Sequence, residues 1–109
     1  MRVFLATLAS CVLAATAFGA QARPLSQNDR SVCGWGAQIA SEAQHAKLSG
    51  VTLYAARKKL QVRRFAKPWM RMTAFGITEQ TYNSSSRLPP KAIKQTYYEQ
   101  CVQHAVARR

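Results

Sequence analysis

The side chains that could do chemistry are concentrated in a basic segment, which we define as residues 57–71. Within it, residues 63–71 read RRFAKPWMR, so that cations alternate with Phe65, Trp69 and Met70. Lys and Arg side chains bind phosphate groups, and aromatic rings stack on nucleobases or lie at the level of lipid headgroups. We therefore predict a binding surface for an anionic partner, made of Arg57, Lys58, Lys59, Arg63, Arg64, Lys67, Trp69 and Arg71.

The competing interpretation of the basic segment is structural, with Phe65 and Trp69 packed in a core and the cations merely solvated. The charge balance favours binding. The sequence has 16 Lys and Arg against 4 Asp and Glu, a formal net charge of +12, and no acidic residue lies between Glu42 and Glu79. We therefore expect no carboxylate to neutralise the segment. Such a field attracts lipopolysaccharide or another envelope polyanion, nucleic acid, or an acidic protein.

Two histidines raise the alternative of a small secreted RNase-like enzyme, in which His45 and His104 would act as general base and acid. The sequence supplies these residue types without a recognisable motif around them. Paired carboxylates, a Gly-rich phosphate loop, a nucleophile-elbow serine and a metalloprotease helix are all missing from it. We therefore expect a non-enzymatic protein that uses no cofactor.

The cysteines predict a covalent link. Cys33 and Cys101 are the two that would remain after removal of an N-terminal export signal, and an even count in an oxidising compartment indicates a disulfide. The alternative is a metal site on Cys101 and His104, which have the i, i+3 spacing of ligands on one helix. That site would need Cys33 as a third ligand, and no fourth is evident, so we expect a disulfide and no metal.

The first 22 residues have the organisation of a cleavable signal peptide. Met1-Arg2 is followed by an apolar run and by Ala20-Gln21-Ala22, which has small residues at the positions a signal peptidase recognises. The run is too short for a typical membrane-spanning helix. A lipobox-like sequence ending at Cys11 offers lipidation as an alternative. We expect cleavage after Ala22 and a location in the periplasm or outside the cell.

The remaining chain predicts a small all-α domain, residues 32–109, after a flexible leader at residues 23–31. The expected first helix has Val32, Trp35, Ile39, Ala43 and Ala46 on its core face and ends at Ser49-Gly50. Three further helices are expected. One is capped by Thr52 and stops between residues 59 and 62, one starts at Pro68, and one is opened by Pro89-Pro90. The disulfide would join the first helix to the last.

In outline, the chain resembles the periplasmic acid-stress chaperones, which are small exported helical proteins with one disulfide between their terminal regions. The resemblance rests on length, export signal, helices and the two cysteines, Cys33 and Cys101. It implies a second function, that of an envelope stress chaperone or structural protein whose charge maintains solubility. The leading expectation remains an exported protein that binds an anionic partner.

Overall fold

Four helices account for most of residues 25–107, the part of the chain that the structure, a computed structural model, describes. The predicted signal peptide, the lipidation alternative at Cys11 and the cleavage position after Ala22 lie outside these residues. The expected all-α bundle is confirmed. Its helices are α2 (Gln27–Leu48), α3 (Leu53–Val62), α4 (Pro68–Asn83) and α5 (Pro90–Ala107).

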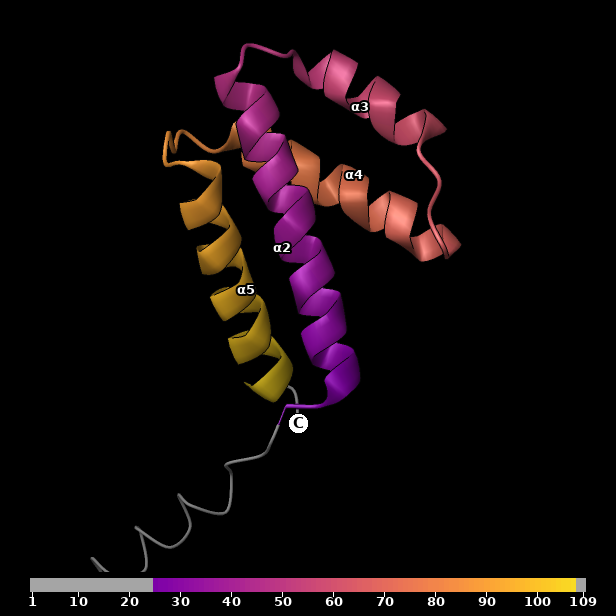
Figure 1. Ribbon diagram of the computed structural model, residues 1–109, viewed down its shortest axis with the longest axis vertical. Helices are drawn as coiled ribbons and strands as arrows, with labels where there is room; N and C mark the ends of the chain where they lie inside the picture. The colour runs from indigo at the N-terminus through magenta and orange to yellow at the C-terminus, as the bar shows by residue number, and fades with distance from the viewer. Residues whose placement is uncertain (1–24, 108–109) are drawn as a thin grey trace, which may run out of the picture.

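The longest helix, α2, is the centre of the arrangement (Figure 1). Helix α5 runs antiparallel beside it, and α4 crosses it at an angle. Helix α3 packs on α4 and makes few contacts with α2. The bundle therefore consists of a close α2–α5 pair and an α3–α4 hairpin that projects to one side of α2.

Helix α2 begins earlier than the sequence led us to expect. Ser26 is its N-cap: the Ser26 hydroxyl accepts a hydrogen bond from the Asp29 amide at 3.0 Å and donates to the Asp29 carboxylate at 2.8 Å. An acidic side chain in the first turn also interacts favourably with the helix dipole. The prediction of a flexible leader is therefore wrong for residues 27–31, which are helical.

The other helix boundaries follow local sequence signals. Thr52 caps α3 by accepting from the Ala55 amide, and Pro68 occupies the first turn of α4, where its missing N–H is tolerated. Gly50, with a φ of 87°, ends the turn after α2 in a conformation that favours glycine. Tyr82 of α4 donates to the Val51 carbonyl at 2.8 Å, and burial raises the pKa of this phenol.

The core lies where α2, α3 and α4 meet. Half-buried aromatic and aliphatic side chains from α2, α4, α5 and the α3–α4 connection pack against its buried residues. On α2 the buried face is wider than predicted, because α5 and α4 cover two sides of this helix: Cys33, Ala37 and Ala40 are buried, whereas Val32 and Ala46 are only half-buried. The central cluster is Ile39, Ala40, Leu60, Ala74 and Ile77, surrounded by Trp35, Phe65, Phe75, Ile93 and Tyr97.

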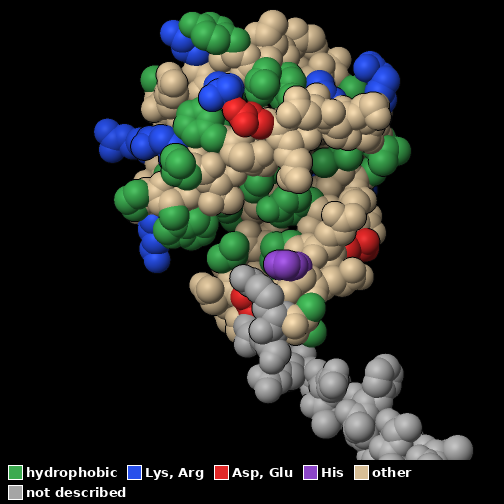
Figure 2. Space-filling model, turned by 180° about the vertical axis from the view of Figure 1, so that it is seen from behind, with side chains coloured by type: hydrophobic (Ala, Val, Ile, Leu, Met, Phe, Trp, Pro, Cys, Tyr) green, Lys and Arg blue, Asp and Glu red, His purple; other side chains and the backbone are tan. Residues whose placement is uncertain are grey.

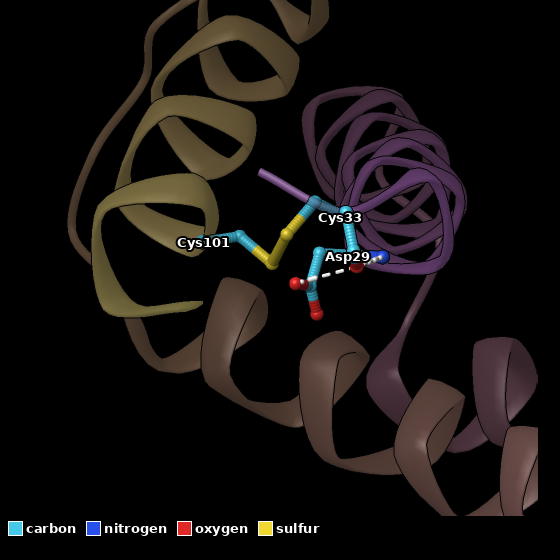
Figure 3. Close-up of a disulfide and its surroundings, with 4 residues drawn as sticks. Asp29, Cys33 and Cys101 are labelled. Atoms are coloured by element: carbon cyan, nitrogen blue, oxygen red, sulfur yellow. Dashed lines mark hydrogen bonds between the residues drawn. A yellow bond between two sulfur atoms is a disulfide. The ribbon is translucent and has the colours of Figure 1, made fainter. Parts of the chain in front are cut away.

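The predicted disulfide is confirmed. Cys33 in the second turn of α2 is bonded to Cys101 in the second half of α5, with their Cα atoms 5.6 Å apart (Figure 3). Because α2 and α5 are antiparallel, the bond joins the start of the first helix to the end of the last. Asp29 lies one turn before Cys33 on the same helix and beside the bond.

Candidate anionic-ligand surface

The eight predicted binding residues are distributed over the two helices of the hairpin and the turn between them. Along this edge Lys and Arg side chains gather around apolar ones (Figure 2). The fold therefore brings the basic segment together at the side of the molecule away from α5, which does not contact α3. Residues Arg57, Lys58 and Lys59 lie on α3, Arg63, Arg64 and Lys67 in the connection, and Trp69 and Arg71 in the first turn of α4.

Two of these cations are paired, which corrects the expectation that no carboxylate neutralises the segment. Arg57 Nη1 lies 2.8 Å from Glu79 Oε2 of α4, and Arg63 Nη1 lies 2.8 Å from Glu42 Oε1 of α2. Both acids are remote in sequence and are brought to the segment only by helix packing. Both pairs are largely exposed, so each contributes roughly 0–1 kcal/mol.

A third cation, Arg71, holds the hairpin turn in place. Its Nη2 atom donates to the Arg63 carbonyl at 2.7 Å, and its Nε atom donates to the Leu60 carbonyl at 3.5 Å. The guanidinium groups of Arg63 and Arg71 each lie 5.4 Å from the centre of the Phe65 ring. Phe65 in turn packs edge-on against Trp35 of α2, so these side chains serve the fold and are not free for a ligand.

Trp69 falls between the two interpretations. Its ring meets Trp35 edge-to-face at 5.8 Å, which ties it to the aromatic packing between α2 and the hairpin. It is nevertheless 44% exposed. One part of the indole therefore packs against Trp35, while another part is exposed and could contact a ligand.

The cations that remain are Lys59, Arg64 and Lys67, which are exposed and have no ion-pair partner among the described residues. Lys58 is also exposed and lies over the Tyr54 ring at 5.4 Å. None of the four Asp and Glu side chains of the sequence pairs with these cations, because each contacts a different side chain. These contacts are Asp29 to Ser26, Glu42 to Arg63, Glu79 to Arg57 and Glu99 to Gln95.

Sequence reasoning missed a groove of about 670 Å³ between α2 and α3, with Thr78 of α4 beneath it. The residues that line it occur at i, i+3, i+4, i+7 spacing on both helices, which places each set on one helix face. Three of these residues, Ala43, Ala46 and Ala56, have small side chains, and α2 and α3 make few contacts, so space is left between the two faces. The facing stripes are Ile39, Glu42, Ala43 and Ala46 on α2, and Ala56, Lys59, Leu60 and Arg63 at α3.

The two histidines are not brought together. His45 lies beside the groove near the end of α2, whereas His104 lines a second hollow of about 500 Å³ beside the disulfide. Since α2 rises roughly 18 Å between Cys33 and His45, the histidines cannot share one scissile bond. The metal alternative required free sulfurs on Cys33 and Cys101, and these are bonded to each other.

Comparison with known proteins finds no family model that matches the chain and no characterised protein or solved structure with significant similarity to it. Among residues 25–107, no helix combines the length and the apolar character needed to cross a bilayer.

Proposed function

We propose that this protein is a non-enzymatic binding protein of the periplasm or the extracellular space. Its basic segment binds a polyanion of the cell envelope, such as lipopolysaccharide. The observation that carries the proposal is the group of unpaired cations at the hairpin, Lys59, Arg64 and Lys67. Since each of the four Asp and Glu side chains contacts a residue other than these three cations, the charge of the cations is available to an external partner.

Apolar side chains at the same hairpin favour an amphiphilic polyanion over a nucleic acid. Val62 at the end of α3 and Met72 in α4 are 82% and 74% exposed, and part of the Trp69 indole is also at the surface. A lipid-bearing polyanion offers acyl chains to these groups and phosphates to the cations. The disulfide is typical of proteins that fold in an oxidising compartment, which agrees with the predicted export signal.

The experiment compares two charge-matched triple variants. In the first, Lys58→Glu, Arg64→Glu and Lys67→Glu reverse exposed cations of the basic segment and leave the paired Arg57 and Arg63 intact. In the second, Arg87→Glu, Lys91→Glu and Lys94→Glu reverse exposed cations at and before the start of α5. Binding to lipopolysaccharide, to duplex DNA and to anionic vesicles is measured over a range of salt concentrations, with circular dichroism to check folding.

We expect lipopolysaccharide affinity to fall steeply with salt, because its phosphates release counterions when the cations bind. The hairpin variant should lose this binding, and the α5 variant should retain most of it. Equal losses from both variants would show that only overall charge matters, as the chaperone or structural alternative implies. Tighter binding to DNA than to lipopolysaccharide would support the basic segment as the binding surface but would identify nucleic acid as the partner.

A further inference from the structure

The groove between α2 and α3 has the size and lining of a small-molecule site. Its volume of about 670 Å³ lies within the range of roughly 300–1,000 Å³ that is common for such sites. Ile39, Ala43 and Ala46 form one wall, and Ala56 and Leu60 form the other. These walls are apolar over about two turns of α2 and one turn of α3, so they suit a hydrocarbon chain.

The edge of the groove carries charge on its α3 side. Lys59 and Arg63 lie one turn apart on the stripe that faces the groove, with Glu42 opposite on α2. Arg63 and Glu42 neutralise each other through their ion pair. Lys59 has no such partner among residues 25–107, so the edge has an unpaired positive charge next to an apolar interior.

This combination selects a particular kind of molecule. A neutral hydrocarbon would leave Lys59 unpaired, and a cationic amphiphile would be repelled by it. A chain with one anionic end satisfies both parts of the site, because an ammonium–carboxylate hydrogen bond is charge-assisted. We propose that the groove binds a fatty carboxylate, with the acyl chain between α2 and α3 and the carboxylate at Lys59.

The inference goes beyond the proposed function, because it assigns a second site and needs no polyanion. Of the unpaired cations that carry the first proposal, only Lys59 lines the groove, and Arg63, which also lines it, is paired with Glu42. Lys58, Arg64 and Lys67, which are reversed to test the first proposal, do not line the groove. The two proposals can therefore fail independently.

The test is calorimetric titration of the full exported protein with dodecanoate below its micelle concentration. Dodecyltrimethylammonium has the same chain with the opposite charge, and butyrate has the carboxylate without the long chain. We expect dodecanoate to bind and both comparison compounds to bind at least about tenfold more weakly, a difference of roughly 1.4 kcal/mol. Equal binding of the cationic amphiphile would overturn the role of Lys59.

Variants locate the site. Ala56→Leu fills the groove from the α3 side and Ala46→Leu from the α2 side, so each should abolish dodecanoate binding while lipopolysaccharide binding persists. Lys59→Gln should weaken dodecanoate binding about tenfold. Lys58→Gln changes the adjacent residue, which does not line the groove, and should leave dodecanoate affinity unchanged. Dodecanoate binding that survives both leucine variants, with normal circular dichroism, would refute the proposal.

Discussion

At the scale of single residues, the two glycines in the first half of α2 have different roles. An added Cβ at Gly36 would lie 2.8 Å from Tyr97 Cε1 and 2.9 Å from Tyr97 Oη, so the Tyr97 ring packs directly on the α2 backbone. At Gly34, apart from the adjoining residues and the local helix backbone, no heavy atom of the described chain lies within 4 Å of such a Cβ. The sequence shows two helix-weakening residues, but only one of them is required by packing.

We expect Gly34→Ala to raise the free energy of unfolding by about 0.5–1 kcal/mol, because Ala is the better helix former. Gly36→Ala should instead lower it by about 1 kcal/mol or more, because Tyr97 must move off its place between α2 and α5. Urea denaturation of the two variants measures both effects. Similar stabilisation by the two substitutions would show that Tyr97 does not depend on this close approach.

At the scale of the elements, the connection between α4 and α5 is held by side chains from the end of α2. The Lys47 ammonium donates to the carbonyls of Thr81, Ser84 and Ser86 at 3.0, 2.9 and 2.9 Å. Gln44, which is fully buried, donates to the Ser86 and Leu88 carbonyls at 3.1 and 2.8 Å. One polar patch on α2 therefore satisfies the carbonyl groups of a loop that has little apolar packing of its own.

Lys47→Met should lower the free energy of unfolding by about 1–3 kcal/mol, because it leaves these carbonyls without their charged donor while preserving the length of the side chain. Lys94→Met, at an exposed position of α5, is the matched control and should change stability by less than about 0.5 kcal/mol. Amide hydrogen exchange should also increase at residues 84–88 in the Lys47 variant alone. Equal effects of the two substitutions would contradict the anchoring role.

What could be predicted from the sequence depended on how local the determining interactions are. Thr52 and Pro68 mark their helix starts through contacts within one turn, so those boundaries were correct. The start of α2 was missed because the Ser26–Asp29 cap lies in a polar stretch without helical periodicity. The basic segment was recognisable from composition, but its ion pairs were not, because Glu42 and Glu79 come from other helices. The groove depends on how far α3 diverges from α2, which no local pattern encodes.

At the scale of the whole molecule, the disulfide closes almost the entire described chain into a ring, since its cysteines are 68 residues apart in sequence. Restricting the unfolded chain over a loop of this length is worth about 4 kcal/mol by the loop-entropy estimate. A small domain with a limited core depends strongly on such a link.

Cys33→Ser should therefore lower the free energy of unfolding by about 2–5 kcal/mol. In the unaltered protein, alkylation in denaturant without reductant should modify neither Cys33 nor Cys101, and reduction should expose both. The reduced protein and the Cys33→Ser variant should have similar stability, which separates the effect of the bond from that of the substitution. Labelling of both cysteines before reduction would refute the bond.

The same ring determines how the molecule would respond to mechanical force. A pull applied to the two ends of the described chain passes from the start of α2 through the Cys33–Cys101 bond to the end of α5. The α3–α4 hairpin and the groove lie inside the covalent loop and off this path, so tension would not extend them while the bond is intact. A force applied by a partner bound to the basic segment would instead reach α2 and α5 through the packing of the hairpin on α2 and through the connections at residues 49–52 and 84–89.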